Sequence, residues 1–447
     1  VLGTIVQKPG IYQSNIHRRL SLVMSRCEIE DVLNELVHLG AVNKKVIVKP
    51  PKVSLFSKPR EFMECDGTAQ RDVLGGGGVY ATYGMRLWFS PQESQRIGYT
   101  FHAGYDFPIH ILQSLLALNI SLTQIWHSNL PSIRGLNTFK TRDRRHFIYQ
   151  TPSIGTMPTD LPSSYLSARI FHFICSANRA IHYVTEILRL RDKNSSPPVF
   201  VWEPIPAEES LQSCIEAMRM VDVVSPNHEE AAALLGLVTD DEEDERFLTD
   251  EMLMFMVDKF LAYQIGRHGN GCVIIRASHK GCIVGTREKK EIIPAYWTTP
   301  KDGGRHPHVV DVTGAGNSFC GGLMAGLLKS NFDVFEAALY GSVSASFVIE
   351  QLGTPRLHID EQGNESWNTG DSPHIRLDKL KQRVKEKLKE KLKVKLKERI
   401  REKRLKQQDD VDGASGVSKE IKDSGDGGHP KDGLDRESVG ESMSPVD

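Results

Sequence analysis

The chain has 447 residues, enough for two or three domains, and its 39% hydrophobic and 25% charged content is typical of a globular protein with polar extensions. The net charge of the whole chain is −1, so the overall charge does not indicate a class of binding partner. The seven cysteines form no Cys-x-x-Cys pair, which argues against a zinc site or a disulfide framework. We therefore expect a reducing compartment, the cytoplasm or alternatively the nucleus, with no membrane span and no signal peptide.

Residues 1–50 predict a small separate module. Ser25–Glu28 has the form of a capping box, Ile29–Val37 carries an apolar helical stripe, and Val42–Val48 favours a strand. This order of helices and strand resembles a winged helix, more loosely one in the large subunit of the RNA polymerase III assembly factor. DNA docking is one interpretation. The acidic residues around Glu30 oppose phosphate and favour protein docking or a structural role instead.

Residues 51–65 are a linker by composition, and residues 66–360 predict an α/β domain. A glycine run precedes alternating strand-like and helix-like segments, the pattern of a parallel sheet covered by helices. The clearest segments are three buried-strand candidates and one helix with small residues on its packing face: Val199–Pro204, Val221–Val224, Cys272–Arg276 and Ala337–Ile349.

The most informative run extends from Val309 to Leu328. An apolar pair, Val309–Val310, predicts the end of a strand, Gly314–Gly316 predicts a tight turn, and the small residues that follow predict a closely packed helix. A glycine turn that opens a helix points free backbone N–H groups at one spot, and the helix dipole adds partial positive charge there. The turn therefore suits a phosphate or a developing oxyanion.

This run resembles the Asp-Thr-x-Gly-Ala-Gly-Asp signature of the PfkB (ribokinase-like) family of sugar and nucleoside kinases. Val312 stands where the family has Thr, and Asn317 stands where it has its catalytic Asp. The resemblance implies a ribokinase-like three-layer α/β/α sandwich with a mostly parallel sheet. It spans roughly Asp66 to Thr354, and Tyr105–Pro108 fits a fungal branch linked to maintenance of a killer virus.

The resemblance also implies phosphoryl transfer from ATP with Mg²⁺ to a small alcohol or sugar. Gly314, Ala315 and Gly316 would form the anion hole, and Asn317 occupies the position of the base. An amide cannot accept a proton at neutral pH, and general-base catalysis is typically worth about 10²–10⁴-fold. We therefore expect activity that is weak or lost, and a non-catalytic nucleotide-binding scaffold is the alternative.

Two further segments match the nucleotide end of the family site. Asn227 and Glu230 fit its Asn-x-x-Glu motif, in which Glu230 serves the metal, although the same pair has the form of a helix-capping box. Arg276 and Gly281 lie where the family binds nucleotide phosphates, and only the glycine is kept. Arg276 is either a phosphate partner or a surface residue.

The resemblance implies that the glycine run binds the acceptor of the phosphoryl group. Gly76, Gly77 and Tyr80 correspond to the sugar-holding element, and kinases that bind ribose have Asn where Tyr80 stands. The aromatic ring of Tyr80 cannot reproduce the hydrogen bonds that an Asn amide both donates to and accepts from sugar hydroxyls. We therefore expect an acceptor other than ribose, either a small polyol or another sugar. The family also has an apolar opening strand ahead of this element. Residues 60–65 are too short and polar to supply one.

Residues 374–407 predict a basic helix, because 376–406 holds sixteen Lys or Arg and five Asp or Glu. Its leucines fall mostly four apart, which makes a poor heptad seam. It is either a solvated helix or an arm attracted to nucleic acid or an anionic membrane. Together with residues 1–50 it supports a third hypothesis, a DNA-associated transcription subunit. Residues 408–447 predict a disordered tail.

Overall fold

The computed structural model describes residues 62–63, 69–70, 73–139, 145–205, 210–237, 248–300, 306–368, 370–390, 393 and 396–399. The predicted winged-helix-like module of residues 1–50 and the predicted tail of 408–447 lie outside these residues. The chain divides into two compact units, Val1–Val384 and Lys385–Asp447. In the second unit the described residues are helical. None of the described helices is long and apolar enough to cross a membrane.

A six-stranded sheet forms the centre of the first unit, in the order β12-β11-β10-β9-β8-β7. Five of its strands run in one direction, four of them as parallel neighbours, and only β11 runs in the opposite direction. The parallel strands are β7 (Ile170–Cys175), β8 (Val199–Pro204), β9 (Val223–Val224) and β10 (Cys272–Arg276), and the antiparallel pair is β11 (Cys282–Gly285) and β12 (Lys290–Ile293). The predicted strands at Val199–Pro204 and Cys272–Arg276 are confirmed, and the one at Val221–Val224 is shorter than predicted.

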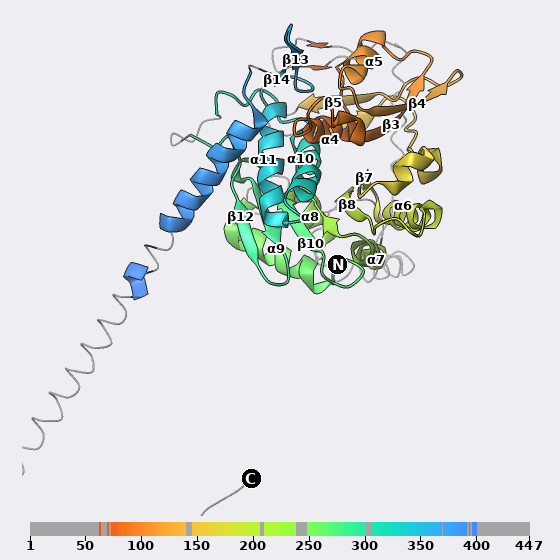
Figure 1. Ribbon diagram of the computed structural model, residues 1–447. Coiled ribbons are helices and arrows are strands. Elements are labelled where there is room, and N and C mark those ends of the chain that lie inside the picture. The colour runs from red at the N-terminus through yellow and green to blue at the C-terminus, as the bar shows by residue number, and fades with distance from the viewer. Residues whose placement is uncertain are drawn as a thin grey trace, which may run out of the picture. The chain divides into compact units, whose positions relative to one another are not determined.

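Helices cover both faces of this sheet (Figure 1). Successive strand residues point to opposite faces, so Val201 and Ile274 join one hydrophobic core while Phe200 and Val273 join the other. The first core is shared with α4 (Gly77–Arg86), α10 (Ala315–Lys329) and α11 (Val334–Val348). The second is shared with α6 (Ala177–Leu190), α7 (Leu211–Met220), α8 (His228–Leu234) and α9 (Asp250–Ala262). The predicted three-layer α/β/α sandwich is thereby confirmed.

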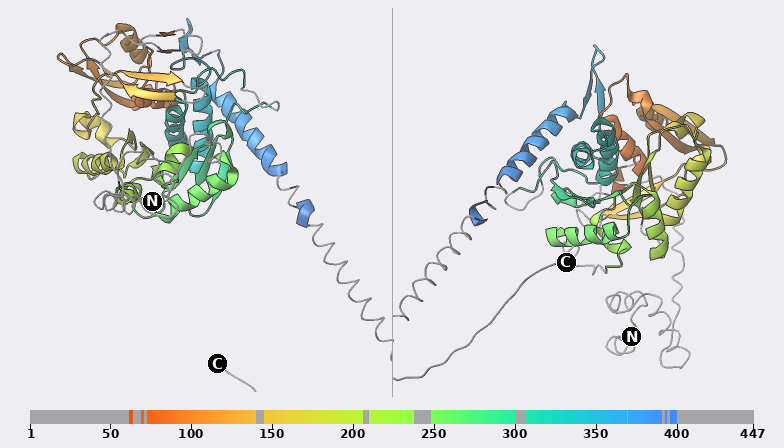
Figure 2. Two further views of the ribbon diagram at one scale, coloured as in Figure 1. Left: turned by 180° about the vertical axis from the view of Figure 1, so that it is seen from behind. Right: turned by 60° about the horizontal axis from the view of Figure 1, so that its bottom comes forward.

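Smaller sheets flank the central one (Figure 2). The parallel strands β3 (Gly98–Gly104) and β4 (Ser121–His127) form a two-stranded sheet, and α5 (Ile109–Leu116) connects them. A four-stranded sheet has the order β2-β1-β5-β6, with β1 (Phe62–Met63), β2 (Ala69–Gln70), β5 (Gly135–Phe139) and β6 (Arg145–Tyr149). A hairpin joins β13 (Leu357–Ile359) to β14 (Glu365–Trp367), and short 3-10 helices are η1 (Ser94–Arg96), η2 (Pro158–Asp160), η3 (Ser163–Ser167) and η5 (Ser278–Lys280). Because β1 is a strand, the predicted linker of residues 51–65 is wrong at Phe62–Met63.

The helices α4 and α10 approach each other closely because of glycine. A Cβ atom on Gly321 would collide with the carbonyl oxygen of Ala81, so only glycine fits this contact. Arg86 at the end of α4 is fully buried, and its guanidinium donates to the carbonyls of Leu118 (2.7 Å) and Phe89 (2.6 Å). The same group pairs with Glu365 in β14 at 2.5 Å. The glycine contact thus holds α4 against α10, and Arg86 ties the end of α4 to β14.

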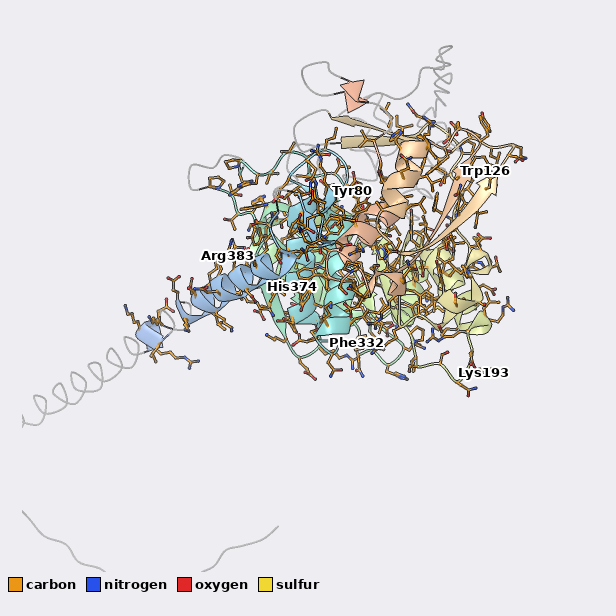
Figure 3. The ribbon with its side chains drawn as sticks, turned by 45° about the horizontal axis from the view of Figure 1, so that its top comes forward. Tyr80, Trp126, Lys193, Phe332, His374 and Arg383 are labelled. Carbon is orange, nitrogen blue, oxygen red and sulfur yellow. The ribbon has the colours of Figure 1, made fainter. Side chains whose placement is uncertain are left out.

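The chain after β14 corrects two predictions, the end of the domain at residue 360 and the purely solvated helix. A helix spans residues 373–390, and its residues up to 384 belong to the first unit (Figure 3). Leu377 and Leu380 are buried in the core together with Arg376. The Arg376 guanidinium donates to Glu350 (2.6 Å) and lies 3.8 Å from the centre of the Phe347 ring. The two leucines are three residues apart, so they lie on one face of the helix. The sequence did not reveal this face, because most leucines of the segment are four residues apart.

The predicted strand end at Val309–Val310 is also wrong. Both residues lie in a loop, and the Val310 amide donates to the carbonyl of Ile349 (2.7 Å) after α11. His306 and His308 in the same loop stack on Trp297, with ring centres 4.6 and 4.5 Å away. The Val310 side chain is exposed, so this loop is held by its backbone hydrogen bond, and α10 begins without a strand directly before it.

Candidate active site

The first turn of α10 is held by a glycine and an aromatic ring. Gly314 is the N-cap residue, with φ 80°, and no side chain caps the turn. A Cβ atom on Gly314 would collide with the ring of Tyr80, which is 4% exposed. Glycine is therefore required here both by its backbone conformation and by the close approach of the ring. Tyr80 supports the turn from α4.

Arg276 lies beneath the same turn. It is the last residue of β10, and a Cβ atom on Gly316 would collide with its guanidinium. Its Nη1 is 3.0 Å from Glu203 and its Nη2 is 3.1 Å from Glu230. Burial alone would lower its pKa, but Glu203 and the other acidic neighbours raise it above the usual value. Arg276 is therefore a buried, permanently charged residue, and the surface alternative is wrong.

Glu203 occupies the centre of the site, although the sequence did not mark it as a site residue. It lies in β8, is 2% exposed, and accepts hydrogen bonds from the Asn317 amide (2.9 Å) and from His172 Nε2 (2.7 Å). Burial would raise its pKa, but the charge of Arg276 and the His172 hydrogen bond hold that pKa below its ordinary range. The signal was a glutamate inside the otherwise apolar run Val199–Pro204.

The bond to Glu203 also orients Asn317. Its Nδ2 donates to the carboxylate, and because the amide group is planar, its Oδ1 faces away from Glu203. A Cβ atom on Gly77, in the first turn of α4, would lie 3.2 Å from the same Nδ2 and would collide with Ile174. The glycine run, with Gly76 at φ 105°, therefore brings the start of α4 directly beside Asn317.

Asn227 and Glu230 form a complete capping box at the start of α8. The Glu230 amide donates to Asn227 Oδ1 and the Asn227 amide donates to Glu230 Oε2, both at 2.7 Å. The same Oε2 accepts from Arg276. The structural interpretation of this pair is thus confirmed, and its oxygen atoms also suit a hard cation. Two carboxylates against one guanidinium give the cluster of Glu203, Glu230 and Arg276 a net charge of −1, which favours cation binding.

His172, Glu203 and Cys320 place one possible ligand atom each within 4.8 Å of one another. Burial, reinforced by the Glu203 carboxylate, raises the pKa of Cys320 well above its usual value. Its thiol donates to the Ser225 hydroxyl at 3.5 Å. The three groups therefore belong to a buried hydrogen-bonded network around Glu203.

All the site residues predicted from the sequence line one cavity of about 2580 Å³. They come from the start of α4, the start of α8, the end of β10, the turn before β11 and the start of α10: Gly76, Gly77, Tyr80, Asn227, Glu230, Arg276, Gly281, Gly314, Ala315, Gly316 and Asn317. Gly281 has φ 100°, and a Cβ atom there would collide with the Ile293 carbonyl, so this glycine is required by the turn itself. His172 and Glu203 line the same cavity.

This chain is similar to several known proteins. Residues 138–358 match the family described as pfkB family carbohydrate kinase. An uncharacterized protein of Schizosaccharomyces pombe is 30% identical over 328 residues, which cover 70% of this chain and 88% of that protein. Protein MAK32 of Saccharomyces cerevisiae is 26% identical over 305 residues, 64% of this chain and 80% of that protein. The structure of ribokinase from Giardia lamblia matches this one with 19% sequence identity and a TM-score of 0.49. The match covers 64% of this chain and 86% of the ribokinase chain. The chain belongs to the PfkB family of carbohydrate kinases.

Proposed function

We propose that this protein is an ATP- and magnesium-dependent phosphotransferase for a small alcohol or sugar, with activity weakened by Asn317. One observation carries the proposal. The uncapped first turn of α10 opens onto the same cavity as Arg276 and the glycine run, and Asn317 lies between them. Phosphoryl transfer depends mainly on positioning and charge stabilisation, and both survive a change of the base.

Each element has a separate task in this proposal. The backbone amides of Gly314 and Gly316 stabilise charge on the transferring phosphoryl group, while the Ala315 amide donates to the carbonyl of Val312 (3.2 Å). Arg276 packs against Gly316 from beneath, and its own charge is paired with Glu203 and Glu230. An added Cβ atom on Gly76 would meet nothing within 4 Å, so the space for the acceptor lies at Gly76, and Asn317 Oδ1 accepts a hydrogen bond from the acceptor hydroxyl. Asn317 therefore orients this hydroxyl without removing its proton.

The residues present suit a magnesium ion. Asn227 and Glu230 supply oxygen atoms, and the neighbouring cluster carries a net negative charge. When bound, the ion neutralises charge on the nucleotide phosphates. Asn227 and Glu230 would hold it there. The buried position of Tyr80 beneath Gly314 supports an acceptor other than ribose, because its ring already packs against the turn.

A non-catalytic nucleotide-binding scaffold is the second candidate, and Glu203 favours it. This carboxylate is bound to Asn317, His172 and Arg276, and its pKa is held low. A carboxylate with a low pKa and three partners is a weak general base. The site therefore keeps its binding elements, while neither Asn317 nor Glu203 is suited to accept a proton.

The two candidates are separated by measuring ATP binding and ATP turnover in the same preparation. Calorimetry with ATP and Mg²⁺ should show binding. ADP release should rise with at least one acceptor from a panel of sugars and polyols if the protein is a kinase. Binding without acceptor-dependent turnover would support the scaffold, and failure to bind ATP would refute both candidates.

A further inference from the structure

His172 is a basic side chain in the same network as Asn317. It lies in β7, its side chain is 7% exposed, and its Nε2 donates to Glu203 Oε1 at 2.7 Å. The other oxygen of that carboxylate accepts from the Asn317 amide at 2.9 Å. One carboxylate thus holds both side chains, and both line the cavity of the candidate site.

Two further contacts place His172 against the first turns of α10 and α4. A ring nitrogen of His172 lies within 4.8 Å of the Cys320 thiol, and Cys320 is one turn after Asn317 on the same face of α10. Ile174 points to the same face of β7 as His172, and a Cβ atom on Gly77 would collide with it. His172 therefore lies close to the space that the glycine run leaves for the acceptor.

The partner of His172 determines which ring nitrogen carries the hydrogen. An ionised carboxylate can only accept, so Nε2 carries the hydrogen, and in the neutral ring Nδ1 holds a lone pair. Nδ1 accepts no hydrogen bond from the residues that the structure describes, and it is not enclosed by protein. Its lone pair is therefore open to the cavity that His172 lines.

We propose that His172 is the general base of the phosphoryl transfer and that Glu203 positions it, an inference that rests on the proposed function. The hydroxyl that Asn317 orients turns about its C–O bond and gives its proton to His172 Nδ1. Its oxygen bonds to the γ-phosphorus of ATP while the bond from that phosphorus to the β–γ bridging oxygen breaks, and ADP leaves. Glu203 stabilises the imidazolium, which then releases the proton to water. The activity that remains without the family's Asp therefore depends on His172.

The charged groups around His172 keep one state near neutral pH. Burial would raise the pKa of Glu203, but Arg276 holds it below its ordinary range, so the carboxylate stays ionised. Burial would lower the pKa of Arg276, but Glu203 raises it. Burial raises the pKa of the Cys320 thiol well above its usual value, so the thiol stays protonated. Glu230 contacts Arg276, and the first turn of α4 has no charged residue. A change in rate between pH 5 and 8, where histidine ordinarily changes charge, thus reports on His172.

Steady-state kinetics of the full-length protein tests this role. ADP release is measured from pH 5 to 8 at saturating ATP and Mg²⁺, with glycerol, xylitol, D-fructose or D-glucose as the acceptor. The wild-type kcat should rise with pH, because protonated His172 cannot accept the hydroxyl proton. His172→Gln keeps an amide nitrogen that can donate to Glu203 but has no basic nitrogen. Its kcat at pH 8 should be about 10²-fold lower and should no longer rise with pH, whereas its affinity for ATP in calorimetry should be unchanged.

His102→Gln is the matched control. His102 is another buried histidine that lines the same cavity, and its Nε2 lies 3.8 Å from Asp160. This variant should keep both the rate and its dependence on pH. If His172→Gln does not bind ATP, the pH profiles of the wild type and of His102→Gln decide.

The outcomes separate this role from the proposed function. A wild-type kcat that is constant from pH 5 to 8 would overturn the role of His172 and leave the kinase function standing. A His172→Gln enzyme with the rate and pH profile of the wild type would do the same, as would loss of the pH dependence in His102→Gln. ATP binding without ADP release for any of these acceptors would overturn the kinase function, and the role of His172 with it.

Discussion

Replacing Asn317 by Asp is the sharpest test of the site, because it restores the family's carboxylate at a position already paired with one. The Asn317 amide nitrogen lies 2.9 Å from Glu203. In Asn317→Asp an oxygen takes the place of that donor and faces a second carboxylate. Two like charges about 4 Å apart repel by about 4 kcal/mol at the effective dielectric near a protein surface. Sharing one proton relieves the repulsion, so one pKa of the pair should rise strongly.

The double variant Asn317→Asp/Glu203→Gln keeps the net charge and reverses the hydrogen bond. Here the glutamine amide introduced at position 203 can donate to the new carboxylate, as Asn317 now donates to Glu203. We expect the single variant to gain less than about tenfold in phosphotransfer at pH 7, because its carboxylate shares a proton. The double variant should gain about 10²-fold or more, within the usual range for general-base catalysis. Coupled assays of ADP release with a panel of acceptors measure both gains, and Glu203→Gln alone is the control.

The pH dependence of stability distinguishes this explanation from simple damage. In Asn317→Asp the carboxyl pair binds a proton more tightly when folded than when unfolded, so its folded-state pKa is raised. The stability of the variant should therefore fall as pH rises from about 4 through that raised pKa, by about 1.4 kcal/mol for each unit of the shift. Denaturant unfolding of both variants at several pH values measures this. A single variant as stable as the double variant at pH 8, or with the full gain in rate, would refute the pairing with Glu203.

Three further outcomes follow from the geometry. Glu230→Gln should weaken binding of ATP with Mg²⁺ by about tenfold in calorimetry, and unchanged affinity would contradict a metal role. Removing residues 373–447 should lower the free energy of unfolding by about 3–5 kcal/mol, because the Glu350 carboxylate loses the Arg376 guanidinium that balances its charge, whereas removing 391–447 should change it little. Gly314→Ala should lower the melting temperature more than Gly236→Ala. Both glycines have positive φ, but only at Gly314 does the added Cβ atom meet a ring.

The sequence identified the parts of the site that depend on the backbone. The Gly-Ala-Gly turn and the apolar runs of β8 and β10 are local patterns, and the structure places them as predicted. Asn227 and Glu230 were found because they match the Asn-x-x-Glu motif, whose spacing is also that of the capping box that the structure shows. Val309–Val310 failed because an apolar pair does not distinguish a strand from a loop anchored on a helix end.

The side-chain network could not be predicted in the same way. Glu203, His172 and Arg276 come from three different strands, and their pairing depends on strand order and on which face each side chain occupies. Arg376 was hidden among sixteen basic residues, and only its contact with Glu350 separates it from the exposed ones. Long-range ion pairs leave no periodic signal in the chain.

The ion pair between Arg86 and Glu365 links residues that are 279 positions apart. During synthesis at about 5–20 residues per second, Arg86 is added to the chain roughly 15–55 s before Glu365. For all of that time α4 lacks this carboxylate, and until residues 315–329 have been made it also lacks the glycine-rich face of α10 on which it packs. The nascent chain must therefore keep an apolar helix with an uncompensated cation from aggregating. Translation speed and chaperone supply thus bear directly on how much of this protein reaches its native state.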